Sequence, residues 1–114
     1  MTLLLCLVAA LHDADTLTCA TGERIRLAGI EASELHGGCH LPRCAPLDGQ
    51  AARAVATRLL LRQTLACEPL GTSWRRIVAR CSLNGRDVGC ALISLGAAAP
   101  WPKYRQRYGL GECK

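Results

Sequence analysis

Two aspartates near the start of the chain have the spacing of metal ligands. Asp13 and Asp15 lie in the stretch 12–16 and are separated by a single residue. In an extended backbone, side chains two residues apart project from one face, with Cα atoms roughly 6.5 Å apart. Two carboxylates in that arrangement suit Ca²⁺ or Mg²⁺, which prefer oxygen ligands. The alternative is an ordinary acidic turn, because aspartate favours turns without any ligand.

A second group of charged residues combines one arginine with two glutamates. Arg26 lies in a predicted strand, and Glu31 and Glu34 follow the end of that strand. One carboxylate is suited to the metal site. The other is suited to activating a water molecule, because an ordinary glutamate is ionised at neutral pH, as a general base must be. The alternative is a polar strand end that leads into a loop.

A third group, Trp74, Arg75 and Arg76, opens the fifth predicted strand. One of these arginines could face Arg26 across a phosphate, so that two guanidiniums neutralise the charge developing on phosphorus. In phosphoryl transfer, one such arginine contributes on the order of 10³–10⁵ in rate. Trp74 could stack on a base or cover the end of a barrel. The alternative is a set of exposed cations on an outer strand.

The elements that must position these groups follow from apolar periodicity and turn-forming residues. Five strands are expected, over residues 2–11, 16–20, 23–30, 64–68 and 74–82. An apolar stripe at helical spacing predicts a helix after an N-cap at Asp48, and Asp87 is expected to cap a shorter helix over 88–95. The order βββ-α-ββ-α predicts an α+β fold, a five-stranded Greek-key barrel of the OB type.

The length of 114 residues predicts one domain over residues 1–114. Glycines and prolines predict a loop over 35–46, and residues from about 100 to 114 are expected to form an irregular tail. The apolar run at the N-terminus is interpreted as a buried first strand and not as a signal peptide, because no basic residue precedes it. The run is too short to span a membrane, so no membrane partner is expected.

Eight cysteines favour disulfides and an oxidising compartment, and therefore a periplasmic or secreted protein. Three pairs could be bridged on the expected register or within one loop: Cys6 with Cys19, Cys67 with Cys81, and Cys39 with Cys44. For the two strand pairs, buried free thiols that pack as small hydrophobes are the alternative. For the loop pair, the alternative is a zinc clip completed by His36 and His40.

The charge balance is compatible with a polyanionic partner. The formal net charge is +5, from 14 Lys+Arg against 9 Asp+Glu, and lysine occurs only at Lys103 and Lys114. Arginine favours bidentate contact with phosphate, so DNA or RNA is a suitable substrate for this arginine-rich chain. The protein is expected to be a monomer. An arginine-rich composition with solvated surface charges is the alternative.

Taken together, these groups resemble the staphylococcal-nuclease-like (thermonuclease) family. The resemblance runs from about Val8 to about Tyr104. It rests on four stretches, of which the second is the most specific: His-Asp-Ala-Asp-Thr-Leu (12–17), Gly-Glu-Arg-Ile-Arg-Leu-Ala-Gly-Ile-Glu-Ala-Ser-Glu-Leu (22–35), Trp-Arg-Arg-Ile-Val-Ala-Arg-Cys (74–81) and Asp-Val-Gly-Cys-Ala-Leu-Ile-Ser-Leu-Gly (87–96). The resemblance implies an OB-fold barrel and Ca²⁺-dependent hydrolysis of phosphodiester bonds in DNA and RNA, which leaves 3′-phosphate ends.

The resemblance also implies a role for each acidic residue. Asp15 and Glu31 would bind one Ca²⁺ ion, together with the backbone carbonyl of Ala32. Asp13 would support the metal site from nearby, and Glu34 would act as the general base for water.

The same resemblance assigns the phosphate and the nucleotide to other residues. Arg26 and Arg76 would hold the scissile phosphate and stabilise the transition state. Trp74 falls where the family has a nucleotide-contacting tyrosine, and Tyr104 matches a second one. Arg75, between Trp74 and Arg76, is expected to contact nucleic acid as well.

Four residues depart from the family pattern. Ala14, Glu31, Ser33 and Arg75 stand where the family has Gly, Asp, Pro and Gly. The longer Glu31 must bend back or shift the ion, and the lost proline leaves the turn to the base less fixed. The main alternative function is therefore a weakly active or inactive OB-fold module that binds nucleic acid. The presence of both arginines and all four carboxylates favours the enzyme.

Overall fold

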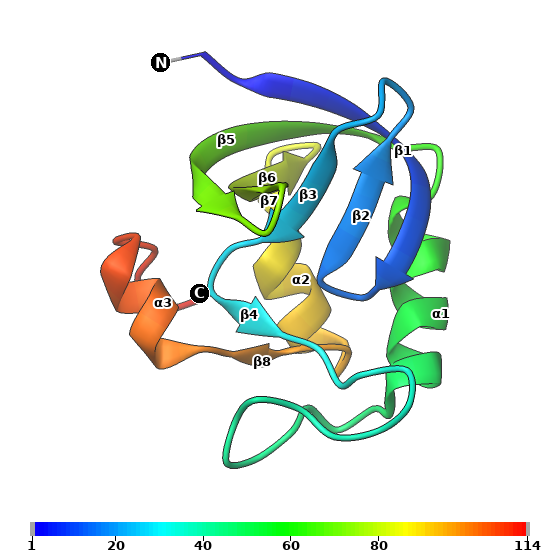
Figure 1. Ribbon diagram of the computed structural model, residues 1–114, viewed down its shortest axis with the longest axis vertical. Coiled ribbons are helices and arrows are strands. Elements are labelled where there is room, and N and C mark those ends of the chain that lie inside the picture. Colours follow the sequence, from blue (N-terminus) through cyan, green and yellow to red (C-terminus); the bar gives the residue numbers. More distant parts are fainter. Residues whose placement is uncertain (1, 114) are drawn as a thin grey trace.

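The computed structural model describes residues 2–113 and shows a closed β-barrel with helices packed around it (Figure 1). Five strands form the wall: β1 (Leu4–Asp13), β2 (Thr16–Cys19), β3 (Arg24–Leu27), β5 (Thr64–Ser73) and β6 (Arg76–Leu83). Their order in the sheet is β3-β2-β1-β5-β6, and a parallel pairing of β3 with β6 closes the barrel. This mixed five-stranded barrel confirms the predicted α+β fold of the OB type.

Strand β1 illustrates how the sequence fills the barrel. Cys6, Val8 and Leu11 are buried, whereas Leu5 and Leu7 lie on the outer face and are exposed. The N-terminal run is thus a strand, as predicted, but only one of its faces is buried, because successive side chains point to opposite sides of a sheet. The interior is built from leucine, isoleucine, valine, alanine and cysteine. Full burial of one Leu or Ile side chain contributes about 1.5–3 kcal/mol.

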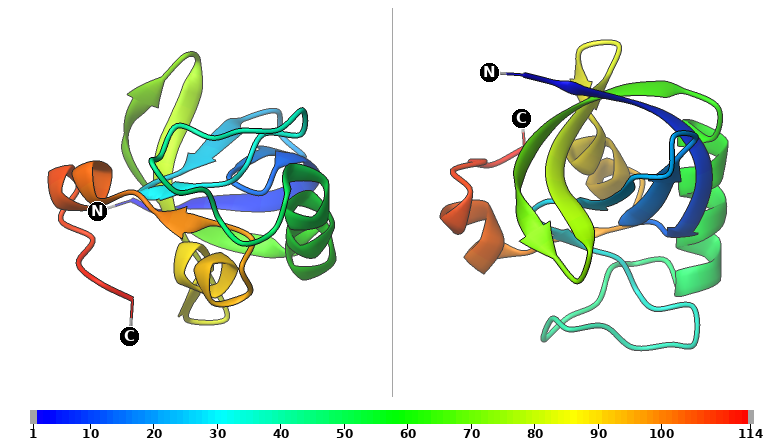
Figure 2. Two further views of the ribbon diagram at one scale, coloured as in Figure 1. Left: turned by 90° about the horizontal axis from the view of Figure 1, so that it is seen from below. Right: turned by 45° about the horizontal axis from the view of Figure 1, so that its top comes forward.

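The two predicted helices begin at their predicted N-caps. Helix α1 (Gly49–Leu60) follows Asp48, and helix α2 (Val88–Ser94) follows Asp87. Each carboxylate accepts a backbone N–H from the first turn of its helix, at 2.8 and 2.9 Å. Such caps satisfy donors that have no partner within the helix. Figure 2 shows the two helices on different sides of the barrel.

The β1–β2 hairpin turns later than the sequence analysis predicted. β1 continues through Asp13, so the turn is formed by residues 14 and 15. Irregularities in the ladder place Val8, and not Cys6, opposite Cys19. Bulges of this kind add a residue to one strand and increase its local twist. As a result, Asp13 ends one strand and Asp15 sits in the turn itself.

The β5–β6 hairpin is longer than predicted. A bulge between Pro69 and Gly71 accommodates the proline, so β5 continues to Ser73. The connection consists of Trp74 and Arg75 alone. Both adopt left-handed backbone conformations, with φ of +53° and +63°. The expectation that these two residues open a strand was wrong, and β6 begins two residues later than predicted, at Arg76.

The C-terminal segment also differs from expectation, because much of it has regular structure. Strand β8 (Ala99–Pro100) pairs antiparallel with β4 (Ile30–Glu31), and residues Pro102–Arg107 form helix α3. Pro102 occupies the first turn, where its missing N–H costs nothing. A short strand β7 (Arg86–Asp87) continues the sheet beyond β6. The predicted irregular tail is therefore confined to the residues that follow α3.

Four disulfides connect the described chain: Cys6–Cys19, Cys39–Cys44, Cys67–Cys81 and Cys90–Cys113. The first three are the pairs nominated from the sequence, and Cys67 lies opposite Cys81 in the predicted register. No cysteine within residues 2–113 is free, so the alternatives of buried thiols and of a zinc clip through Cys39 and Cys44 are wrong.

The disulfides indicate an oxidising compartment, such as a periplasm or the extracellular space. Across residues 2–113, none of the helices has the length and apolar character needed to cross a bilayer.

Candidate active site

One pocket of about 440 Å³ gathers most of the residues singled out by the sequence. Its lining comes from both ends of the β1–β2 turn, from β3 and β4, from the β5–β6 hairpin and from the C-terminal segment. Eight of the predicted side chains line it: Asp13, Asp15, Arg26, Glu31, Glu34, Trp74, Arg76 and Tyr104. Arg75 does not line the pocket and is exposed on the hairpin turn.

Arg26 links the two carboxylates predicted to hold a metal. Its Nη2 lies 3.5 Å from an oxygen of Asp15 and 3.2 Å from an oxygen of Glu31. The guanidinium also donates to the backbone carbonyls of Leu27 and Ile30, at 2.7 and 2.9 Å. Asp15 is only 5% exposed and Glu31 only 3%. Buried carboxylates require such compensation, because the charges have lost most of their water.

Asp15 is fixed by two further donors from different parts of the chain. The Thr16 hydroxyl donates to one carboxylate oxygen at 3.0 Å, and the N–H of Ala32 donates to the other at 2.9 Å. The backbone of Ala32 therefore lies beside Asp15. A ligand role for the Ala32 carbonyl stays a prediction.

Asp13 and Glu34 complete the acidic side of the pocket. Burial raises the pKa of Asp13 above its ordinary value of 3.8, and the negative charges of Asp15 and Glu34 raise it further. His12 and Arg53 act in the opposite direction on this pKa. Asp15 and Glu34 thus add repulsion to an effect that burial dominates. A divalent cation among them would relieve that repulsion.

The backbone turn that carries Glu34 is held by the start of helix α1. The N–H of Glu34 donates to the Gly38 carbonyl, and the N–H of Gly37 donates to the Glu34 carbonyl, both at 2.9 Å. Gly49 packs against this turn so closely that an added Cβ would lie 2.1 Å from the Glu34 carbonyl oxygen. Only a residue without a side chain fits at that position. The loop thus has a defined path to Glu34 without a proline at position 33.

Arg76 approaches the pocket from the β5–β6 hairpin. Its Nε donates to the backbone carbonyl of Ser73 at 3.2 Å, and its Nη2 lies 3.4 Å from the Ser73 hydroxyl. These contacts are with neutral groups, and within residues 2–113 Arg76 forms no ion pair with a carboxylate, in contrast to Arg26. The adjacent Trp74 is 88% exposed on the turn. The pocket therefore has one arginine engaged by acids and another available to an anion.

The C-terminal segment supplies an aromatic wall that the sequence analysis only partly foresaw. The Trp101 and Tyr104 rings meet edge to face at 4.8 Å, and the Tyr104 and Tyr108 rings stack at 6.4 Å. The Arg107 guanidinium lies 5.1 Å from the centre of the Tyr104 ring. All four residues line the pocket. The spacing of the three aromatic residues is helical, and this signal was present in a segment interpreted as irregular.

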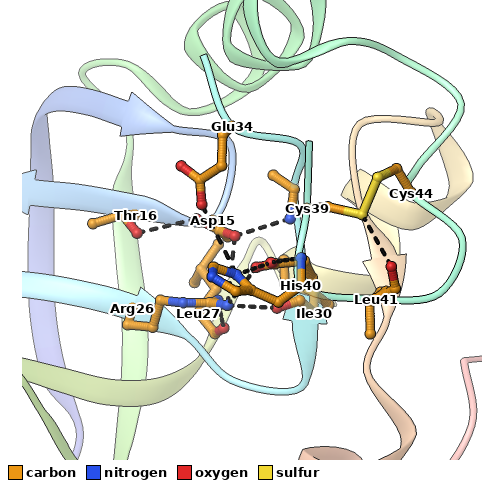
Figure 3. A network of polar contacts seen from close by, with 12 residues as sticks. Asp15, Thr16, Arg26, Leu27, Ile30, Glu34, Cys39, His40, Leu41 and Cys44 are labelled. Atoms are coloured by element: carbon orange, nitrogen blue, oxygen red, sulfur yellow. Dashed lines mark hydrogen bonds and ion pairs between the residues drawn. A yellow bond between two sulfur atoms is a disulfide. The ribbon is translucent and has the colours of Figure 1, made fainter. Parts of the chain in front are cut away.

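His40 is the other residue that sequence reasoning missed in this role. It projects from the loop between β4 and α1, and its ring nitrogen Nδ1 lies 2.6 Å from a carboxylate oxygen of Glu31. Its backbone N–H donates to the same oxygen at 2.9 Å. Figure 3 shows Asp15, Arg26, Glu34 and His40 turned toward one another. No local pattern indicates this position, because it depends on the path of a loop closed by a disulfide.

The donor atoms of the pocket fit a divalent cation. Four carboxylate side chains line one pocket, and two of them, Asp15 and Glu34, add to the rise that burial causes in the pKa of Asp13. Within residues 2–113, one group of three ligand-type side chains has donor atoms all within 4.8 Å of one another: Glu31, Glu34 and His40. Asp15, predicted as a ligand, is held by Arg26 and stands outside that group. The set is compatible with a metal ion and does not specify calcium.

No protein-family model matches the chain, and a search of curated proteins gives no match. The fold and the pocket are therefore the basis for inferring function.

Proposed function

We propose that this chain is a metal-dependent phosphodiesterase of the thermonuclease type that cleaves DNA or RNA. The observation that carries the proposal is the meeting of four carboxylates and two arginines in one pocket at the barrel mouth. These residues come from separate strands and loops, and a random surface rarely collects such a set. Enzymes that transfer phosphoryl groups depend on this pairing of acids with guanidiniums.

The remainder of the pocket suits a nucleic acid as the substrate. Trp74, Trp101 and Tyr104 offer ring faces or edges to bases, and Arg107 adds a positive charge beside them. Aromatic stacking contributes about 1–3 kcal/mol per base and tolerates any sequence. The net charge of +5 favours the approach of a polyanion. DNA and RNA share these features, so the proposal covers both.

In the proposed reaction, Arg26 and Arg76 hold the scissile phosphate. Arg76 binds it directly, and Arg26 turns from its carboxylate partners toward the phosphate oxygens as the substrate enters. Glu34 accepts a proton from a water molecule, and the water oxygen forms a bond to phosphorus. The bond from phosphorus to the 5′ oxygen breaks, and that oxygen takes a proton from solvent. The products are a 3′-phosphate and a 5′-hydroxyl.

The divalent cation would be held by Asp15 and Glu31, with Asp13 in support, and Ca²⁺ is our first choice because the donors are oxygens. When bound, it would supply positive charge that polarises the phosphate. The Thr16 hydroxyl and the Ala32 N–H fix Asp15 in place beforehand.

The decisive experiment incubates the oxidised protein with labelled single-stranded DNA and RNA, with Ca²⁺ or with chelator. We expect calcium-dependent cleavage and 3′-phosphate ends, identified by mass spectrometry of the fragments. Binding without cleavage at any divalent cation would instead support the alternative of a nucleic-acid-binding module. Products with 5′-phosphate ends would contradict the direction of attack.

Three variants test the assigned roles. Arg26→Ala and Glu34→Gln should each lower kcat by orders of magnitude, about 10²-fold or more for a lost base or phosphate ligand. Arg80→Ala is a matched control, since Arg80 is exposed on the outside of the barrel, pairs with Asp87 and does not line the pocket. Normal cleavage by both site variants would show that the roles are wrongly assigned.

A further inference from the structure

The loop between β4 and α1 brings an imidazole to the acidic pocket, where the proposed calcium site has only oxygen donors. His40 Nδ1 lies 2.6 Å from a carboxylate oxygen of Glu31 and 4.0 Å from one of Glu34. The three donor atoms all lie within 4.8 Å of one another. Ligands of a zinc ion sit about 2.0–2.2 Å from the metal, so two donors on one tetrahedral ion are roughly 3.4 Å apart. To bind zinc, His40 Nδ1 and the Glu31 oxygen must give up the proton they share and separate slightly, and the Glu34 oxygen must move closer.

We propose that Glu31, Glu34 and His40 form a second metal site that selects Zn²⁺ or a similar transition-metal ion over Ca²⁺. Imidazole nitrogen is a favoured ligand of Zn²⁺, Co²⁺ and Ni²⁺, whereas Ca²⁺ takes oxygen ligands. Two carboxylates and one histidine leave a coordination position for water, as in open zinc sites. The proposal identifies a site that overlaps the calcium site and differs from it in one ligand type.

Three contacts fix two of the ligands, Glu31 and His40, in position. Arg26 occupies one carboxylate oxygen of Glu31, so the other oxygen is directed toward His40. The His40 ring stacks nearly parallel to the Trp101 ring, with centroids 6.1 Å apart and an angle of 8°. The disulfide between Cys39 and Cys44 closes the loop immediately beside His40. Ligand side chains fixed by such outer contacts bind a metal with less loss of entropy.

The side chain of His40 is 66% exposed, and that of Glu34 is 46% exposed. An ion can therefore reach the cluster from solvent without any opening of the barrel. Glu31, in contrast, is buried, so the site has one fixed ligand at its base and two accessible ligands at its rim.

The site has a consequence for catalysis, and this part rests on the proposed function. Glu34 is the proposed general base, and a carboxylate bound to Zn²⁺ is no longer free to accept a proton from water. Glu31 is shared with the calcium site, so the two ions exclude each other. We therefore expect Zn²⁺ to inhibit cleavage, and an excess of Ca²⁺ to relieve that inhibition.

The test of the site measures zinc binding directly, by isothermal titration calorimetry on the oxidised full chain. Reductant is omitted, because freed thiolates would bind zinc themselves. We expect one Zn²⁺ per chain in the wild type, and binding weakened at least about tenfold in His40→Ala. His36→Ala is the matched control, because His36 is exposed in the same loop and lies outside the cluster. Co²⁺ binding, followed by visible absorption, reports the ligand geometry independently.

Equal zinc affinity in His40→Ala and the wild type would overturn the site, as would loss of binding in His36→Ala alone. Circular dichroism and thermal unfolding verify that each variant is folded. The inhibition is then measured as the ratio of each variant's cleavage rate with zinc to its own rate without zinc. Zinc binding in a protein that cleaves nothing would overturn the proposed function and leave the site standing. Cleavage without zinc binding would do the reverse.

Discussion

The barrel wall and the rim around its pocket are built on different principles. In the wall, Cys6–Cys19 and Cys67–Cys81 join neighbouring strands, and all four of these cysteines are buried among apolar side chains. At the rim, Cys39–Cys44 closes a short exposed loop that carries His40. The first kind of link stabilises the fold, whereas the second kind positions one side chain.

The backbone differs between the two regions in the same way. The wall strands pair regularly apart from bulges, and alternation decides which side chains are buried. The rim includes the left-handed residues Trp74 and Arg75, and the close approach of Gly49 to Glu34. Conformations of this kind cost free energy and persist where the surrounding structure enforces them. Stability therefore resides in the wall, while the proposed chemistry depends on a few strained contacts at the mouth of the barrel.

The largest effect on stability should come from removing a wall disulfide. Replacing Cys67 and Cys81 together by alanine should lower the free energy of unfolding by about 3 kcal/mol, as expected for a closed loop of this length. The same change at Cys39 and Cys44 should cost clearly less, because the exposed loop gains freedom in the folded state. Urea denaturation of both double variants checks the contrast. Equal losses would remove the distinction between wall and rim.

A change at the rim should affect the rate of cleavage, whereas the loss of a wall disulfide affects the free energy of unfolding. Gly49→Ala would place a Cβ 2.1 Å from the Glu34 carbonyl oxygen, so the turn that carries the proposed base must shift. A misplacement of about 1 Å costs on the order of 10²-fold in rate. We expect kcat to fall by that factor while KM changes little, at a temperature where the variant is fully folded. Gln50→Ala, the exposed next residue of α1, is the control and should cleave normally.

The wall could be predicted from the sequence because its determinants are local. Period-two alternation and two aspartate N-caps predicted the barrel and two of its helices, and the register of β5 with β6 nominated Cys67–Cys81. Cys39–Cys44 was nominated because the two residues share a loop, and Cys6–Cys19 on a strand register that differs from the observed one. The bond between Cys90 and Cys113 was not foreseen, since no strand pairing relates these two residues. The convergence of Asp15, Arg26 and Glu31 was predicted through the family resemblance and not from periodicity.

The rim could not be predicted in the same way, because its contacts join residues that are distant in sequence. The approach of His40 to Glu31 depends on a loop path, and the position of Gly49 against Glu34 depends on how α1 docks. Nothing in a short window of sequence encodes either contact. Helix α3, in contrast, has local signals: Pro102 suits the first turn of a helix, and Tyr104 and Tyr108 have helical spacing. The prediction of an irregular tail did not take these signals into account.

The hairpin turn offers a smaller test on stability. Arg75 has a φ of +63°, and a left-handed conformation costs a residue other than glycine roughly 1–2 kcal/mol. Arg75→Gly should therefore raise the free energy of unfolding by about 1 kcal/mol, after the greater entropy of glycine in the unfolded chain is deducted. Arg75→Asn also removes the charge, but asparagine tolerates the left-handed conformation. Comparing the two variants therefore separates the effect of the charge from that of the backbone. Both variants should bind DNA more weakly at low salt if Arg75 contacts nucleic acid. A loss of stability in Arg75→Gly would contradict the assignment of strain to this turn.

The smallest effect concerns the pH dependence of stability in the metal-free protein. Burial, followed by the charges of Asp15 and Glu34, raises the pKa of Asp13 in the folded state. The folded chain therefore binds this proton more tightly than the unfolded chain, so the contribution of Asp13 to stability falls as pH rises through the interval above 3.8. In chelator, Asp13→Asn should be more stable than the wild type at pH 7, and the difference should vanish below pH 3.8.

Saturating Ca²⁺ should reverse the order at pH 7, because the cation stabilises the cluster of carboxylates in the wild type and finds one fewer in the variant. Thermal unfolding with chelator and with calcium measures both signs. An Asp13→Asn variant that is less stable in chelator would mean that the repulsion at the rim is already compensated within the protein, and that the pocket has no need of a cation.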